Sequence, residues 1–172
     1  EYHFKYAKSG EYDYGCYSKL FTSQKKELIS AYEVVISERQ FNDISLYEHF
    51  IQVCGKHGMD TDKLRHFMDY MILSDFVLSG RDRHLGNVSI LRDAESLRFI
   101  APAPIYDSGK CLFIQDTVPA NDRDLLSIKT ESFASDELKM LKLVKDRNCL
   151  DVTKLPARSY IEELYALDSK MD

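Results

Sequence analysis

Residues 80–87, with the sequence GRDRHLGN, are the most informative stretch of this chain for its fold. This stretch is polar and contains glycine, whereas the segments before and after it are rich in apolar residues. Polar loops held between rigid elements are where proteins often place catalytic groups, because the scaffold fixes both ends of the loop. We therefore expect packing elements on both sides and the chemistry in the loop itself.

The segment before the loop has the pattern of a long buried helix. Its apolar residues recur at intervals of three and four, as one buried helix face requires: Leu64, Phe67, Met68, Met71, Ile72 and Phe76. The pattern predicts a helix over 61–78, ended by Ser79 and Gly80. Asp75 falls on the apolar face of this helix, where we expect a buried polar contact with the loop that follows.

Two further helices are predicted from capping boxes, in which a Ser hydroxyl and a Glu carboxylate satisfy amides of the first turn. One begins at Ser45 with Glu48, and the other begins at Ser159 with Glu162. Between them, apolar spacing predicts a helix over about 135–147. We expect three of its residues to face inward: Leu138, Leu141 and Val144.

Strand patterns occupy much of the remainder. Residues 2–20 alternate between apolar and polar types on either side of a polar turn, which predicts a hairpin. Residues 88–91 and 97–101 predict a second hairpin. The segment 27–36 is ambiguous, because its β-branched end favours a strand whereas its length would also suit a helix. Together these elements predict an α+β fold that is predominantly helical and carries short β-hairpins.

Composition narrows the class of protein. The chain has 172 residues, of which 44% are apolar, which suits one domain with a sizeable core. Its net charge of −5 and its scattered basic residues indicate that it does not bind nucleic acid directly. We expect no association with a membrane, since no apolar run is long enough to span one and no leader is visible.

The four cysteines and the first residue add two expectations. The cysteines are widely spaced and form no zinc-binding pattern, so we expect reduced, mostly buried thiols in a cytoplasmic protein: Cys16, Cys54, Cys111 and Cys149. The chain begins with Glu1 and not with Met, so we expect it to be part of a longer product.

Asp82, Asn87 and Asp107 form a pattern that suits phosphoryl transfer. This reaction needs a carboxylate that orients or deprotonates the attacking hydroxyl, together with oxygen ligands that hold Mg²⁺ on the nucleotide phosphates. Asp82 and Asn87 supply a base and a metal ligand from one loop. Asp107 follows the predicted hairpin, which is a natural way to return a second carboxylate to the same metal.

The same residues carry a family resemblance. The sequence DRHLGN, followed by VSIL, a hairpin and APIYDSG, resembles the catalytic and metal-binding stretch of HipA-like serine/threonine kinases. The resemblance implies that Asp82 is the catalytic base and that Asn87 and Asp107 bind the metal and the nucleotide. His84 matches a loop position on the nucleotide side, where its side chain would brace the loop without reacting.

The resemblance also implies a domain layout. Residues 1–172 would form the C-terminal lobe of a kinase-like fold, in which 1–40 are a remnant of N-lobe strands and hinge and 41–172 are the helical lobe. No glycine-rich phosphate loop and no nucleotide-binding strand lysine are recognisable. We therefore expect the chain by itself to bind nucleotide weakly and to lack activity without its N-lobe.

The implied cofactors and partners follow from the family. They are ATP, Mg²⁺, a protein substrate phosphorylated on Ser or Thr, and an antitoxin-like partner protein of a bacterial toxin–antitoxin pair. Other classes stay open from the residues alone. Small-molecule and lipid kinases carry similar loops, and a kinase-like lobe without activity would serve as a binding module. A transition-metal site of two carboxylates and His84 is a further alternative, which the lack of a second nearby His disfavours.

Overall fold

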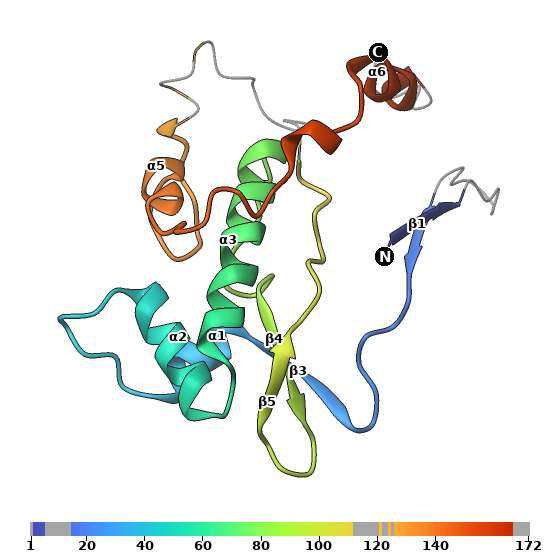
Figure 1. The fold of residues 1–172 in the computed structure, drawn as a ribbon. Helices are drawn as coiled ribbons and strands as arrows, with labels where there is room; N and C mark the ends of the chain where they lie inside the picture. Colours follow the sequence, from blue (N-terminus) through green and yellow to red (C-terminus); the bar gives the residue numbers. More distant parts are fainter. Residues whose placement is uncertain (1, 6–14, 112–120, 122–123, 125, 167–172) are drawn as a thin grey trace.

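The protein is an α+β fold in which helices pack beside a small antiparallel sheet (Figure 1). The structure, a computed structural model, describes residues 2–5, 15–111, 121, 124 and 126–166. Side chains are described from Ser18 onward, with the exception of Leu164 and Tyr165. The predicted α+β fold class is therefore confirmed.

The larger sheet contains β3 (Lys26–Ser30), β4 (Ser89–Asp93) and β5 (Phe99–Pro102), in that spatial order and with both pairs antiparallel. The predicted hairpin after the loop is confirmed as β4 and β5. The third strand comes from the segment that fitted either a strand or a helix. The lobe boundary near residue 40 stays a prediction, although β3 and β4 pair across it.

Ser30 is where the ambiguous segment changes from strand to helix. Its hydroxyl accepts a hydrogen bond from the amide of Glu33, and the Glu33 carboxylate accepts one from the Ser30 amide. This capping box starts α1 (Ala31–Ser37) directly after β3. The segment is thus a strand followed by a helix, and the β-branched residues that favoured a strand lie in the helix.

A separate two-stranded ladder lies near the start of the chain. β1 (Tyr2–Lys5) pairs antiparallel with β2 (Gly15–Ser18), and Tyr2 lies opposite Ser18. The first predicted hairpin is therefore confirmed in its strands. Its predicted turn lies outside the described residues.

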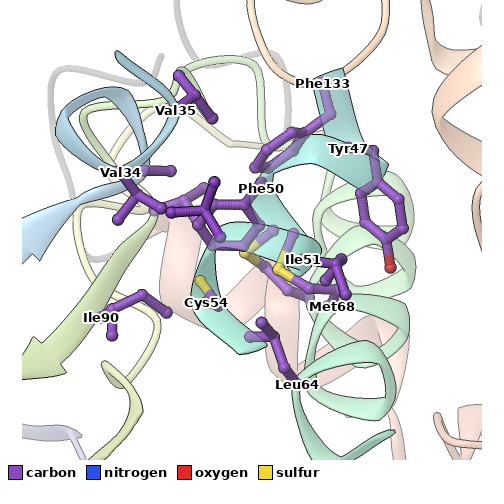
Figure 2. Close-up of a cluster of buried hydrophobic side chains, with 14 of the residues drawn as sticks. Val34, Val35, Tyr47, Phe50, Ile51, Cys54, Leu64, Met68, Ile90 and Phe133 are labelled. Carbon is purple, nitrogen blue, oxygen red and sulfur yellow. The ribbon is translucent and has the colours of Figure 1, made fainter. Parts of the chain in front are cut away.

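The core lies where α1, α2 (Leu46–Lys56), α3 (Thr61–Leu78) and β4 meet (Figure 2). Both predicted helices are confirmed, with Ser45 and Asp60 as their N-caps. Phe50 is fully buried, and its ring lies 5.1 Å from that of Phe133, centroid to centroid. Four methionines are also buried in this core: Met59, Met68, Met71 and Met140.

The helix predicted over 135–147 is much shorter than expected. The structure has α5 over Glu137–Leu141 only, and α5 contacts α3. It ends because the Asp69 carboxylate accepts hydrogen bonds from the amides of Lys145 and Asp146, which a longer helix would use internally. Of the residues expected to face inward, Val144 is buried but Leu138 is exposed, so that expectation is wrong for Leu138.

The last helix and the cysteines also require corrections. α6 spans Arg158–Ala166, so Ser159 lies inside its first turn and is not the N-cap. The carbonyl of Ala157 accepts the first amide hydrogen bonds, and Glu162 pairs with Arg158 instead. A short 3₁₀ helix, Val152–Lys154, precedes α6.

Three of the four cysteines have described side chains, and these are free thiols. Only Cys54 is buried, whereas Cys111 and Cys149 are partly exposed because they lie in loop segments, so the expectation of mostly buried thiols is wrong for these two. Among the helices within the described residues, none combines the length and apolar character needed to cross a bilayer.

Candidate active site

The predicted catalytic loop leaves α3 through a tight turn. Ser79 caps the helix in the left-handed conformation, with φ of 51°, and the Gly80 amide donates a hydrogen bond to the Asp75 carbonyl at 2.7 Å. A Cβ at Gly80 would lie 2.9 Å from an Asp75 carboxylate oxygen. A larger residue at this position would have to displace the Asp75 carboxylate, so glycine suits this close approach.

The far end of the loop is attached to α1. The amide of Ala31 donates to the Val88 carbonyl at 2.7 Å, and the amide of Tyr32 donates to the Leu85 carbonyl at 3.2 Å. The first amides of a helix have no partner within the helix itself, so they are available for such contacts. The start of α1 therefore fixes the end of the loop through the loop's own backbone.

Arg83 joins three segments at the centre of the loop. Its guanidinium binds the Asp75 carboxylate of α3 through Nε at 2.9 Å and Nη2 at 3.1 Å. Nη1 donates to the carbonyls of Asn87 at 3.0 Å and Tyr106 at 2.6 Å, and Nη2 also donates to the Ser108 hydroxyl at 3.0 Å. The side chain is buried, with 7% exposed. The contact predicted for Asp75 is confirmed, and Arg83 is its partner.

Sequence reasoning missed the role of Arg83. One signal was available, because a carboxylate on the apolar face of a helix needs a partner with matching charge. The guanidinium suits this position because its planar fork binds a carboxylate with two parallel hydrogen bonds and keeps donors for other groups. Burial raises the pKa of Asp75, and the hydrogen bonds and charge of Arg83 oppose that rise.

Tyr106 provides a second link between the loop and the segment that carries Asp107. Its hydroxyl donates to the Gly86 carbonyl at 2.8 Å, and the Ser89 hydroxyl lies 2.6 Å from the same oxygen. Since Tyr106 uses its own proton on Gly86, Ser89 is the donor in the second bond. The two predicted metal-binding regions, around Asn87 and Asp107, are thus attached to each other through side chains and backbone.

The three predicted reactive residues lie on this frame. The Asn87 side-chain nitrogen donates to the Asp82 carbonyl at 2.9 Å, which leaves its amide oxygen as the atom available to a cation. The Asp82 carboxylate is 35% exposed and forms an ion pair with Lys110, with 3.1 Å between Oδ2 and Nζ. Asp107 lies between Tyr106 and Ser108, both of which hydrogen bond to Arg83.

Asp107 has an unusual backbone conformation. Its φ is 52°, in the left-handed region that residues other than glycine adopt uncommonly. Such conformations persist where surrounding contacts impose them, and they occur often at ligand-binding positions. Its side chain is exposed, and within the described part of the chain it has no hydrogen bond or ion pair to the protein. The carboxylate is therefore open to a ligand from solvent.

His84 braces the turn of the loop, as its predicted structural role requires. Its Nδ1 accepts a hydrogen bond from the Gly86 amide at 3.0 Å, and its carbonyl accepts one from the Asn87 amide at 2.9 Å. A Cβ at Gly86 would lie 2.8 Å from the imidazole ring, so glycine allows this close approach. The predicted contribution of His84 to nucleotide binding stays a prediction.

A small polar cavity lies between α3 and α5, and Arg83 forms part of its lining. Its lining includes Asp75, Arg81, Ser132 and Glu137. The volume of the cavity is about 20 Å³, which holds about one water molecule and is too small for a nucleotide. Burial, followed by repulsion from Asp75, raises the pKa of Glu137 to about 6, and attraction to Arg81 opposes the rise.

The donor set fits a hard divalent cation. The amide oxygen of Asn87 and the carboxylate of Asp107 are both oxygen ligands, which Mg²⁺ prefers over nitrogen or sulfur. Within the described residues, no group of three His, Cys, Asp or Glu side chains is arranged to hold a metal ion on its own. A cation at this site would therefore take its remaining ligands from substrate phosphates and water.

Comparison with known proteins gives a kinase as a relative. No family model matches the chain. Over 101 residues the chain is 30% identical to the serine/threonine-protein kinase CtkA of Helicobacter pylori. The matched stretch covers 56% of this chain and 31% of CtkA. The chain is homologous to a serine/threonine kinase. It spans about a third of the length of this relative.

A solved structure gives the same relative. The crystal structure of the Helicobacter pylori proinflammatory kinase CtkA aligns with a TM-score of 0.46 and 21% sequence identity. The alignment covers 91% of this chain and 59% of that one. The sequence similarity supports a kinase-like function in general terms.

Proposed function

We propose that this chain carries the phosphoryl-transfer centre of an ATP- and Mg²⁺-dependent kinase that phosphorylates Ser or Thr residues of proteins. The observation that carries the proposal is the shared guanidinium of Arg83, which holds the backbones of Asn87 and Tyr106 together on Nη1. The residues predicted as metal ligands, Asn87 and Asp107, are thus attached to one rigid group. Asp82, the predicted base, belongs to the same loop.

The residues have distinct roles in this reaction. Asp82 binds the attacking hydroxyl and accepts its proton as the hydroxyl oxygen forms a bond to the γ-phosphorus of ATP. The bond between that phosphorus and the bridging oxygen breaks, and its electron pair leaves with ADP. Catalysis of this kind depends on positioning and on charge stabilisation more than on covalent help from the protein.

Asn87 and Asp107 would hold Mg²⁺, which when bound neutralises charge on the phosphates. Their side chains meet the needs of a ligand pair, because the Asn87 amide is oriented by the Asp82 carbonyl and the Asp107 backbone is fixed by its neighbours. The APIYDSG context of Asp107 supports the HipA type of kinase within the wider superfamily. An antitoxin-like partner and a bacterial cytoplasmic location remain part of that assignment.

The test is phosphate transfer by the full-length protein that contains this chain. The protein would be incubated with Mg²⁺, γ-labelled ATP and a mixture of candidate protein acceptors. We expect Asp82→Asn and Asp107→Asn each to lower the rate by about 10³-fold or more, because each removes a group that acts in the transition state. Asp43→Asn, in the exposed loop before α2, is the matched control and should leave the rate unchanged.

The site of phosphate incorporation separates the remaining candidates. Label on Ser or Thr of a protein supports the proposal, whereas label only on a lipid or a small molecule would assign the chain to another kinase class. Transfer that survives both Asp82→Asn and Asp107→Asn would remove the proposed roles altogether. Circular dichroism of each variant would show whether a loss of activity reflects a loss of fold.

A further inference from the structure

Lys110 is the basic side chain paired with the proposed base. Its ammonium lies 3.1 Å from Oδ2 of Asp82, and the two side chains are 55% and 35% exposed. The Lys110 carbonyl also accepts a hydrogen bond from the Arg81 amide at 2.9 Å. The backbone contact therefore holds the Lys110 side chain beside Asp82, whatever the strength of the ion pair itself.

The segment that carries Lys110 is attached to the loop at several points. The Arg83 guanidinium donates to the Tyr106 carbonyl and the Ser108 hydroxyl, and the Arg81 amide donates to the Lys110 carbonyl. A segment fixed in this way presents its side chains in defined directions. Lys110 therefore reaches Asp82 from the same short stretch that presents Asp107.

Stability does not explain this placement. Ion pairs between partly exposed side chains contribute little to stability, because water screens both charges. An ammonium beside a general base also has a cost, since it occupies the carboxylate that must accept a proton. The pair is better explained if the ammonium has a second partner when substrates are bound.

Building on the function proposed above, we propose that Lys110 binds the phosphoryl group that is transferred. Asp82 holds the attacking hydroxyl, and that hydroxyl must come within about 3–3.5 Å of the phosphorus. The phosphoryl oxygens then lie within reach of an ammonium that contacts Asp82. Lysine suits this role, because it binds phosphate as a compact charge on a flexible stem.

The proposal gives the ion pair a function in the reaction cycle. Without nucleotide, Lys110 neutralises Asp82. When nucleotide is bound, its ammonium moves to the phosphoryl oxygens, where negative charge is concentrated in the transition state. Asp82 then becomes available to the hydroxyl. The guanidinium of Arg83 cannot replace Lys110 in this role, because Asp75, Asn87, Tyr106 and Ser108 already occupy it.

The experiment compares Lys110→Met with two other variants of the full-length protein. Lys110→Arg keeps the positive charge. Lys63→Met is the matched control, since Lys63 also forms an exposed pair with an aspartate, Asp60, at 3.3 Å, but at the opposite end of α3. For each protein, kcat and KM for ATP would be measured in the transfer assay, and the Kd for ADP by calorimetry.

We expect Lys110→Met to lower kcat by about 100-fold, as removal of one charge-stabilising donor does elsewhere. ADP affinity should stay within about twofold, because ADP lacks the phosphoryl group in question. Lys110→Arg should recover most of the lost rate, and Lys63→Met should match the wild type. A Lys110→Met enzyme with kcat within about threefold of wild type would overturn the inference, as would an equal loss of ADP affinity.

The same assay separates this inference from the proposed function. If the wild-type protein transfers phosphate and Asp82→Asn abolishes the transfer, but Lys110→Met does not alter kcat, only the assignment of Lys110 fails. If the wild-type protein transfers no phosphate to any acceptor, the proposed function fails, and the role of Lys110 fails with it.

Discussion

The apolar core around Phe50 and the polar loop around Arg83 fix the same part of the molecule by different physical means. Phe50 packs against Phe133 and neighbouring apolar side chains, and its contribution grows with the area removed from water. Arg83 makes directional bonds to three segments, and these depend on the positions of individual atoms. Changes in the core should therefore alter stability, whereas changes in the loop should alter both stability and chemistry.

The largest expected effect on stability comes from the core. Phe50→Ala should lower the free energy of unfolding by about 3–5 kcal/mol, because it removes a large buried ring and leaves a cavity. Urea titration followed by circular dichroism would measure the loss. Phe41→Ala is the control, since Phe41 is 63% exposed and should change stability by about 0.5 kcal/mol or less. Equal losses from the two variants would contradict the assigned core.

The next effect in size comes from the loop. Arg83→Met should cost about 2–3 kcal/mol, since it leaves the Asp75 carboxylate without its hydrogen-bond partner in a mostly buried position. It should also reduce phosphate transfer more than its effect on stability explains, because Asn87 and Tyr106 lose their shared contact. Urea titration and the transfer assay on one preparation would separate the two losses.

Two further substitutions test whether the charge or the planar fork of Arg83 matters. Arg83→Lys keeps the charge but loses the planar fork, so it should restore stability better than it restores activity. Arg92→Met removes a more exposed ion pair, with Glu27, and should cost at most about 1 kcal/mol without affecting transfer. Full activity in Arg83→Met would show that the loop does not depend on this side chain.

The smallest expected effect concerns pH and Glu137. Its pKa in the folded protein is about 6, above the ordinary value of 4.5, mainly because the carboxyl is partly buried. The folded state therefore binds the proton more tightly than the unfolded state does. Stability contributed by this group should be present below its ordinary pKa and lost as the pH rises through its folded pKa.

Glu137→Gln should remove this dependence. After allowance for solvent screening, the variant should be more stable than the wild type by at most about 1 kcal/mol near neutral pH, and the two should be similar near pH 4. Urea titrations at both pH values would measure the difference. Glu95→Gln, at an exposed position in the turn between β4 and β5, is the control. A wild type that gains stability relative to Glu137→Gln as the pH rises would reverse the assigned sign.

Local patterns were enough to predict the elements around the loop. The helix over 61–78 and the hairpin that follows it were predictable, because hydrophobic spacing and turn residues within each segment specify them. The helix over 135–147 was not, because its end depends on Asp69, a residue far away in the sequence. Spacing within a segment carries no information about a distant side chain that takes its amides.

For the candidate site, the residue types and their order can be read from the sequence: Asp82, Asn87 and Asp107. The contacts that hold them in place are visible in the folded protein alone. The fold pairs Arg83 with Asp75 and Tyr106, and it brings Lys110 to Asp82. These contacts join residues that are separated along the chain, so they arise from packing and directional hydrogen bonds that form only once the helices and the sheet have met.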